Sequence, residues 1–323
     1  MRAIVQRGYG TPAAVLRLED VPDPVAGPGE VLVRVDAAGV NAADWHLVLG
    51  LPYVMRGAGI GLRGPKEPIP GLDLAGVVET VGDGVTRLRP GDRVFGSAAR
   101  TFAELANVPD KRVVPTPSAL PSVEAAAVPL AALTALQGLR TTETAPGQRV
   151  LITGASGGVG TFAVQIAAAH GAHVTAVCSR RNVDLVRSLG ADEVIDYTAQ
   201  DVTTWPGTYD LILHLAGPLP PSAARRLLAP DGTLLLSSGQ GGDWFGPLPW
   251  MGFTIAVGRL TGRRVRFLTM RTRREDLDTI AAMLTSGAIR PVMDRTYPLA
   301  EAATAVQYLK DGHTQGKTVL TVA

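Results

Sequence analysis

The chain has 323 residues, a formal net charge of +2 at pH 7 and 46% hydrophobic residues. This length exceeds what one small core usually organises, so we expect two domains. The near-neutral charge, with scattered basic residues, gives no footprint for nucleic acid or for an anionic membrane surface. The single cysteine, Cys178, excludes an internal disulfide and a cysteine-rich metal site, and it indicates a reduced, cytoplasmic setting.

The first 120 residues show short strand patterns separated by turns. The strand patterns are MRAIVQ, EVLVRVDAAGV, DLAGVVETVG and DRVFG, and Gly-Pro, Pro-Gly and Asp-Gly pairs stand between them. Short strands with this punctuation are typical of a compact antiparallel barrel or sandwich. No apolar run reaches the length of a membrane span, so we expect no membrane association.

The pattern changes at residue 121. One helix is expected from Val123 to Arg140, and from Arg149 onward strands and helices alternate. Runs such as LILHLAG and TLLLSSG are typical of strands that are covered on both faces, which predicts a parallel, doubly wound sheet. The closing strand could return to the first domain. We therefore assign residues 1–120 and 270–323 to one domain and residues 121–269 to the other.

A glycine-rich loop follows the first strand of this alternating region. In RVLITGASGGVG, the strand at Arg149–Thr153 runs into the loop, and a helix starts at Thr161. Glycines in this context permit a sharp turn, close approach of the backbone to a diphosphate and tight helix packing. The spacing G-x-x-G-x-x-G differs from the common G-x-G-x-x-G. The alternative interpretation is therefore a glycine-rich turn that binds no ligand. The predicted diphosphate-binding residues are Gly154, Ser156, Gly157, Gly158, Val159 and Gly160.

The residues after the second strand indicate which dinucleotide is bound. An acid at this point holds the ribose 2′-hydroxyl of NAD, whereas a basic group accepts the 2′-phosphate of NADP. The strand ends at Cys178 and is followed by Ser179, Arg180 and Arg181. Guanidinium groups are planar, permanently charged forks that suit a phosphate. The sequence therefore predicts NADPH, with two plain surface arginines as the alternative.

Several longer motifs carry a family resemblance over essentially the whole chain. They are GVNAAD, PGLDLAGVVETVG, PGDRVFG, FAELANVP, ALTAL, GASGGVG and SLGADEVIDY. The chain resembles the zinc-independent branch of the medium-chain dehydrogenase/reductase superfamily, the group of quinone oxidoreductases and enoyl reductases. This resemblance implies an α/β protein with a GroES-like β-barrel domain and a Rossmann domain, and with NADPH and substrate in the cleft between them.

The positions of the zinc ligands are altered in this sequence. Zinc-bearing relatives have a cysteine where this chain has Asn41, and a His-Glu pair where it has Leu72 and Asp73. A catalytic zinc needs three protein ligands, and the five histidines show no ligand spacing. We therefore expect no metal. Without a Lewis acid, the acceptor must take hydride unaided, as an α,β-unsaturated carbonyl or a quinone does.

The resemblance also implies roles for individual residues. Asn41 corresponds to an asparagine near the nicotinamide ribose, and Thr134 to a threonine near the pyrophosphate and nicotinamide end. Asp44 is either a catalytic acid or a helix cap. Tyr53 either donates a hydrogen bond or proton to the enolate or lines the substrate pocket. The remaining cofactor-binding residues are Ser179, Arg180, Arg181 and Tyr197 in the 2′-phosphate pocket, and Ser238 and Gly239 below the nicotinamide.

Some positions depart from the family pattern or stay open. Asn182 replaces a lysine that some quinone reductases use on the 2′-phosphate. His214 is either a hydrogen-bonded core residue or a residue that faces the cofactor. The aromatic-rich, loop-like segment from Gly241 to Leu260 is a substrate lid or a dimer contact. The edge strand from Val265 to Thr269 is expected to pair with its copy in a homodimer.

The resulting functional prediction is an NADPH-dependent, zinc-free reductase of activated C=C bonds or quinones. The family also includes tailoring reductases and reductive cyclases of natural-product pathways, which the sequence neither supports nor excludes. The alternatives are a metal-free carbonyl/alcohol oxidoreductase and a non-catalytic NADPH-binding sensor or scaffold. The physiological substrate and the proton donor are not determined by the sequence.

Overall fold

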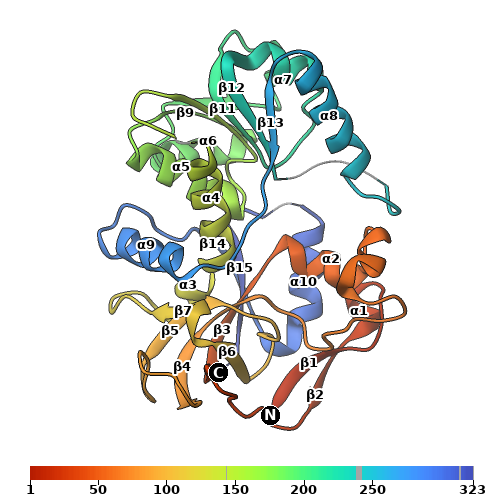
Figure 1. The fold of residues 1–323 in the computed structure, drawn as a ribbon, viewed down its shortest axis with the longest axis vertical. Coiled ribbons are helices and arrows are strands. Elements are labelled where there is room, and N and C mark those ends of the chain that lie inside the picture. The colour runs from red at the N-terminus through yellow and green to blue at the C-terminus, as the bar shows by residue number, and fades with distance from the viewer. Residues whose placement is uncertain (143, 238–241, 313, 323) are drawn as a thin grey trace. The chain divides into compact units, whose positions relative to one another are not determined.

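The computed structural model describes residues 1–142, 144–237, 242–312 and 314–322 and divides the chain into two compact units (Figure 1). The first unit comprises Met1–Leu133, Arg271–Gly287 and Pro291–Ala323. The second comprises Thr134–Met270 and Ala288–Arg290. The first unit therefore continues past residue 120, where the strand pattern of the sequence ends, and takes in the segment up to Leu133.

A large, mostly antiparallel sheet forms the first unit. Its order is β14-β15-β3-β4-β5-β7, with β6 also paired to β3, and only β14 and β15 run parallel. A small antiparallel pair, β1 with β2, accompanies it. The strands are β1 (Arg2–Gln6), β2 (Leu16–Asp20), β3 (Glu30–Val40), β4 (Asp73–Val81), β5 (Arg93–Ser97), β6 (Leu105–Pro109), β7 (Val113–Pro115), β14 (Met293–Pro298) and β15 (Lys317–Thr321).

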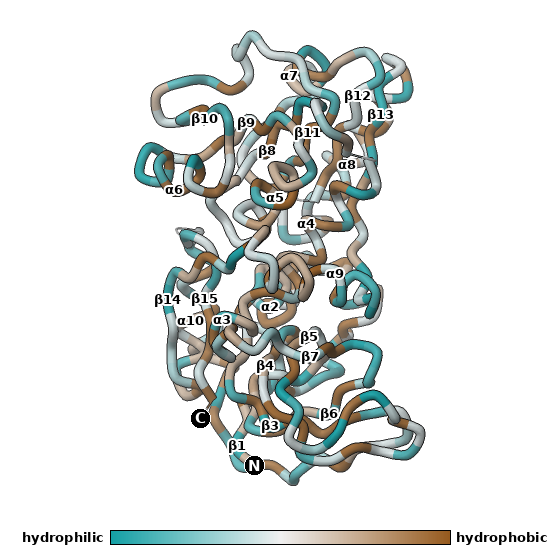
Figure 2. Tube along the Cα trace, turned by 90° about the vertical axis from the view of Figure 1, so that its left-hand side faces the viewer, coloured by the Kyte–Doolittle hydropathy of each residue, from teal (hydrophilic) through white to brown (hydrophobic). Residues whose placement is uncertain are grey.

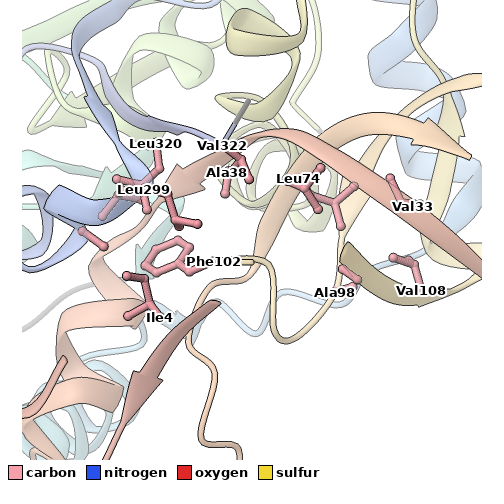
Figure 3. Packing of buried hydrophobic residues seen from close by; sticks show 14 of the residues in the cluster. Ile4, Val33, Ala38, Leu74, Ala98, Phe102, Val108, Leu299, Leu320 and Val322 are labelled. Atoms are coloured by element: carbon pink, nitrogen blue, oxygen red, sulfur yellow. The ribbon is translucent and has the colours of Figure 1, made fainter. Parts of the chain in front are cut away.

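The core of the first unit joins residues from both ends of the chain. Figure 3 shows Phe102 together with Ile4, Leu299 and Leu320, all of which are buried. Burial of such side chains is the main favourable contribution to folding. The helices of this unit are α1 (Pro12–Val15), α2 (Ala42–Leu49), α3 (Ser122–Ala126), α9 (Arg274–Thr285) and α10 (Ala302–Lys310).

The second unit is built on a fully parallel sheet. Its order is β10-β9-β8-β11-β12-β13, so the direction of winding reverses between β8 and β11. This confirms the predicted doubly wound sheet. The strands are β8 (Arg149–Thr153), β9 (His173–Cys178), β10 (Glu193–Asp196), β11 (Tyr209–His214), β12 (Leu228–Leu236) and β13 (Arg264–Phe267). Figure 2 shows hydrophobic stretches along the strands and hydrophilic ones in the turns.

Helices cover both faces of the parallel sheet. α5 contacts β8 and β9 and α6 contacts β9 and β10, whereas α7 contacts β12 and α8 contacts β13 (Figure 1). The remaining helices are α4 (Pro129–Thr141), α5 (Gly158–Ala169), α6 (Val183–Ser188), α7 (Pro221–Leu227) and α8 (Leu248–Leu260). Within the described ranges, no helix has the length and apolarity that a membrane crossing requires.

Two local predictions were wrong. The single helix expected over Val123–Arg140 is two helices, α3 and α4, because Pro129 lacks an N–H and starts a new helix. The loop-like segment up to Leu260 contains the helix α8. Its glycines and β-branched residues weaken the sequence signal for a helix. Packing against β13 decides instead, because a Cβ at Gly258 would lie 2.5 Å from the Val265 side chain.

Gly160 is a position at which the fold tolerates no side chain. A Cβ there would lie 2.2 Å from the Gly154 carbonyl oxygen, so Gly160→Ala should lower the free energy of unfolding by about 1–3 kcal/mol. Gly252→Ala in α8 is the control, because its Cβ would meet nothing within 4 Å. We expect the control to be neutral or slightly stabilising. Urea denaturation compares the two variants, and equal midpoints would contradict the packing argument.

Candidate functional site

The carboxyl edge of the parallel sheet places the glycine loop at the reversal of strand order. In doubly wound sheets, ligands bind outside the carboxyl ends of the strands at such a reversal. The loop leaves β8 with Gly154 at φ +68°, a left-handed conformation that favours glycine. The Gly157 N–H then donates to the Gly154 carbonyl at 3.1 Å, and α5 begins at Gly158. The predicted turn is therefore present.

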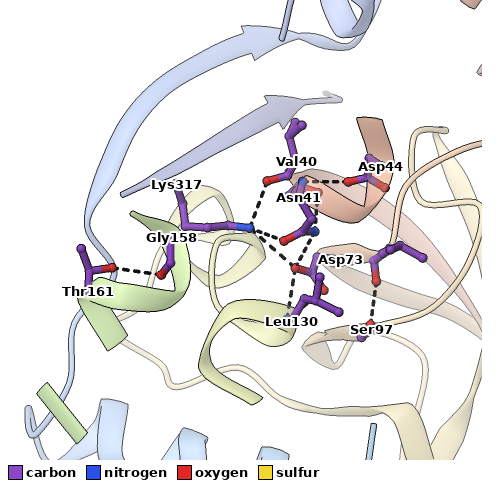
Figure 4. Close-up of polar contacts among 11 residues, drawn as sticks. Val40, Asn41, Asp44, Asp73, Ser97, Leu130, Gly158, Thr161 and Lys317 are labelled. Atoms are coloured by element: carbon purple, nitrogen blue, oxygen red, sulfur yellow. Dashed lines mark hydrogen bonds and ion pairs between the residues drawn. The ribbon is translucent and has the colours of Figure 1, made fainter. Parts of the chain in front are cut away.

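The start of α5 has the chemistry of an anion site. N–H groups in the first turn of a helix have no partner within the helix and carry partial positive charge. Thr161, which is buried, donates its hydroxyl to the Gly158 carbonyl at 3.1 Å and fixes this turn (Figure 4). The half-buried hydroxyl of Ser156 lies in the same loop. This donor set fits a dinucleotide diphosphate.

The predicted 2′-phosphate residues meet at the ends of β9 and β10. Ser179 follows β9 and leads into a 3₁₀ turn at Arg180–Asn182. Tyr197 follows β10, and its N–H donates to the Cys178 carbonyl at 3.1 Å, which holds the two segments together. Arg180 and Arg181 are exposed, as is Tyr197. The structure thus gathers side chains that are 16 to 18 residues apart in the sequence.

An acid that sequence reasoning missed lies beside these arginines. Asp196 ends β10, in register with Cys178 at the end of β9. Its carboxylate accepts hydrogen bonds from the Thr198 N–H at 2.9 Å and the Thr198 hydroxyl at 2.6 Å. These bonds, and to a smaller extent nearby Arg180, lower the pKa of Asp196. The acid comes from the third strand of the region, so searching the end of the second strand could not find it.

His214 ends β11 at the same reversal and is a hydrogen-bonded buried residue. Its Nδ1 lies 2.9 Å from the Thr153 hydroxyl oxygen, which also accepts the Leu215 N–H at 3.1 Å. The Ala216 N–H also donates to this oxygen, at 3.4 Å, so both of its lone pairs are occupied. The Thr153 hydroxyl therefore donates to Nδ1, which assigns the proton of the neutral imidazole to Nε2. Desolvation lowers the pKa of His214 to about 4, so the ring is neutral at pH 7. These contacts support the first of the two alternatives for His214, a hydrogen-bonded core residue, over a residue that faces the cofactor.

In the first unit, Asn41 and Asp44 form the start of α2. Asn41 is its N-cap, and its N–H donates to Asp44 Oδ2 at 2.7 Å. Asp44 is fully buried, and its Oδ1 has no hydrogen-bond partner in the described part of the chain. Burial raises the pKa of Asp44 to about 7. The contacts of Asp44 are those of a helix cap, the second of its two predicted roles.

A buried lysine completes this cluster, and sequence reasoning missed it. Lys317 begins β15 and is 3% exposed. Its ammonium donates to the Val40 carbonyl at 3.0 Å and to Asn41 Oδ1 at 2.5 Å, and it lies 3.9 Å from Asp73 Oδ2 (Figure 4). The available signal was a lysine as the first residue of a closing strand that contains Val319 and Leu320, where a buried charge without a partner would be costly.

Asp73 connects the lysine to two further segments. Its Oδ2 accepts from the Asn41 amide at 3.0 Å, and its carboxylate accepts from the Leu130 N–H at 3.1 and 3.2 Å. Burial raises the pKa of Asp73 to about 6, against the opposing effect of Lys317. Burial also lowers the pKa of Lys317. The Asn41 amide therefore has fixed partners for its oxygen and for its nitrogen.

Tyr53 lies on the surface of the first unit, after α2. Its side chain is 37% exposed, and the Arg56 guanidinium lies 4.6 Å from its ring centroid and 4.3 Å from that of Tyr9. Arg56 also donates to the Gly50 carbonyl at 2.9 Å. Stacking of a guanidinium on aromatic faces is favourable and fixes this segment. Trp45, which lies in α2, stacks on His46 with ring centroids 3.6 Å apart.

Thr134, Ser238 and Gly239 are the remaining predicted cofactor-binding residues. Thr134 lies in α4 and is 8% exposed. Ser238 and Gly239 lie outside the described residues. No group of three or more His, Cys, Asp or Glu side chains that could hold a metal occurs among the residues that the structure describes.

Comparisons with known proteins match both parts of the chain. The family model "Alcohol dehydrogenase GroES-like domain" matches residues 27–118, and "Zinc-binding dehydrogenase" matches residues 189–320. The chain is 35% identical to a chloroplastic quinone-oxidoreductase QR1 of Triphysaria versicolor, over 99% of this chain and 98% of the relative. It is 30% identical to a chloroplastic NADPH-dependent alkenal/one oxidoreductase of Arabidopsis thaliana, over 99% and 79%.

A solved structure supports the same assignment. The quinone oxidoreductase of Coxiella burnetii has a TM-score of 0.88 and 28% identity, over 100% of this chain and 99% of that one. The chain therefore belongs to the medium-chain dehydrogenase/reductase superfamily, among the quinone oxidoreductases and related reductases, a family of nicotinamide-dependent oxidoreductases. The predicted combination of a GroES-like barrel domain and a Rossmann domain is confirmed.

The buried lysine yields a prediction about stability. Lys317→Met leaves the Asp73 carboxylate buried without a cation, so we expect the free energy of unfolding to fall by about 3–5 kcal/mol. Lys317→Met/Asp73→Asn should recover part of this loss, because the buried Asp73 charge is then removed together with its cation. Urea denaturation measures the effect, with exposed Lys310→Met as the control. A double variant no more stable than the single one would show that the charge pair is not responsible.

Proposed function

We propose that the protein is an NADPH-dependent, zinc-free reductase that transfers hydride to an activated carbon–carbon double bond or to a quinone. The observation that carries the proposal is the meeting of Ser179, Arg180 and Arg181 with Tyr197 at one corner of the parallel sheet. Two guanidinium groups and a hydroxyl suit a 2′-phosphate. The names of the relatives, a quinone oxidoreductase and an alkenal/one oxidoreductase, support the acceptor class.

The chain's own residues would bind and orient the cofactor, which supplies hydride from its nicotinamide ring when bound. The first-turn N–H groups of α5 would bind the diphosphate, with the Ser156 hydroxyl beside them. The aromatic ring of Tyr197 would lie against the adenosine. Neutral His214 adds no positive charge next to the diphosphate loop.

The zinc-free part of the proposal rests on the buried cluster of Asn41, Asp73 and Lys317. Asn41 and Asp73, which stand at zinc-ligand positions of zinc-bearing relatives, bind each other, and an ammonium group lies beside both. Charge on the acceptor oxygen would then be stabilised by hydrogen-bond donors, for which the exposed Tyr53 is the candidate. Metal analysis that finds one equivalent of zinc, removed by chelation together with activity, would contradict this part.

We also propose that the protein forms a homodimer through β13. This strand lies at the end of the sheet order, and the exposed side chains of Phe253, Leu260 and Phe267 lie on it and on neighbouring α8. An open strand edge favours pairing with another strand. A monomer in sedimentation experiments at micromolar concentration would contradict the proposal. A cytoplasmic location, without nucleic-acid or membrane partners, remains part of the proposal on the grounds of charge and composition.

The cofactor preference is testable by titration. We expect wild type to bind NADPH more tightly than NADH, and Arg180→Ala/Arg181→Ala to lose about tenfold or more in NADPH affinity with little change for NADH, because only NADPH carries the 2′-phosphate. Arg225→Ala, an exposed arginine on α7, is the control. Equal affinity of wild type for the two cofactors would refute NADPH specificity.

The reaction class is testable with a panel of enones, quinones and saturated ketones, followed by NADPH consumption. We expect turnover of enones or quinones but not of ketones. Tyr53→Phe should lower kcat for enones if the hydroxyl stabilises the enolate, by about tenfold or more. Turnover of ketones alone would favour a metal-free carbonyl reductase. NADPH binding with background consumption for every acceptor, in wild type and variant alike, would favour a sensor or scaffold.

A further inference from the structure

Asn182 is a buried polar side chain between the two loops of the candidate cofactor site. It ends the 3₁₀ turn after β9 and is 3% exposed. Its backbone N–H donates to the Ser179 carbonyl at 2.8 Å, and its side chain does not cap α6. The usual structural reason for an asparagine before a helix, side-chain capping, therefore does not apply here.

The side chain instead connects two serine hydroxyls. Asn182 Nδ2 donates to Ser156 Oγ in the glycine loop at 2.8 Å and to Ser179 Oγ at 3.3 Å. A serine hydroxyl has one hydrogen to donate and two lone pairs to accept with. Because Asn182 occupies a lone pair of each serine, the hydrogen of each hydroxyl stays available for an outside acceptor. Both serines are thereby held as donors.

The arrangement leaves one atom unsatisfied. Asn182 Oδ1 is buried and has no hydrogen-bond partner among the described residues. An unpaired buried acceptor is unfavourable, so the fold tolerates a penalty at this position.

We propose that Asn182 is a positioning residue that determines cofactor specificity by holding Ser179 as a hydrogen-bond donor toward the 2′-phosphate of NADPH, while its second bond holds Ser156 as a donor toward the diphosphate that NADPH and NADH share. The inference rests on the proposed cofactor site. A lysine would supply charge, whereas Asn182 supplies orientation. Neutral donors matter at this corner because Asp196 lies close enough to Arg180 to offset part of its charge.

The test compares Asn182→Asp with Asn182→Ala. A carboxylate of the same shape only accepts hydrogen bonds, so it would turn both hydroxyl hydrogens inward and add negative charge. We expect Asn182→Asp to weaken NADPH binding by about tenfold or more and NADH binding by less than about threefold. Asn182→Ala should change the NADPH/NADH affinity ratio in the same direction by a smaller factor, because it removes the donor without adding charge.

A double-mutant cycle separates positioning from plain stability. If Asn182 acts through Ser179, Asn182→Ala and Ser179→Ala should have non-additive effects on the affinity ratio. A fall in melting temperature with an unchanged ratio in both Asn182 variants would overturn the inference in favour of a structural role. Failure of the proposed function has a different signature, namely a wild type that does not prefer NADPH. A changed ratio in Asn182→Asp with additive effects in the cycle would refute action through Ser179.

Discussion

The ammonium group of Lys317 joins parts of the first unit that are far apart in the sequence. It binds the end of β3 and Asn41 directly, and through Asp73 it is connected to β4 and to the Leu130 N–H at the start of α4. A buried charge needs a partner, so these segments are constrained to meet at one point. The geometry of Asn41 and the start of α2 follow from this constraint, because the lysine and the aspartate fix the orientation of the Asn41 amide.

The second unit depends on a different constraint, the unsatisfied N–H groups at the start of α5. The reversal of strand order between β8 and β11 opens the edge at which those groups stand. The neutral His214, which is hydrogen-bonded to Thr153 at the end of β8, adds no charge at this edge. The two units therefore differ in their electrostatics. In the first unit, the buried Lys317 ammonium is neutralised by Asp73. In the second unit, the first-turn N–H groups of α5 can bind an anion.

Asn182 shows why a departure from a family pattern need not be a loss. In the sequence it is the absence of a lysine, which moves the task of binding phosphate to the arginines. In the structure it is a buried link between Ser156 and Ser179, with an unpaired oxygen. The direction in which a hydroxyl donates depends on its neighbours in space. Asn182 and Ser156 are 26 residues apart, so the sequence could not reveal this link.

The sequence by itself determined the elements that local patterns encode. The glycine loop, the parallel strands and the acid-free turn after Cys178 follow from residue periodicity, glycine conformation and charge, which act over a few neighbouring residues. Only the tertiary structure decided the partners of Lys317, the capping contacts of Asp44, the position of Asp196 beside Arg180 and the existence of α8. Burial and hydrogen bonding between distant segments decide these features, because the free energy of a polar group depends on what surrounds it in space.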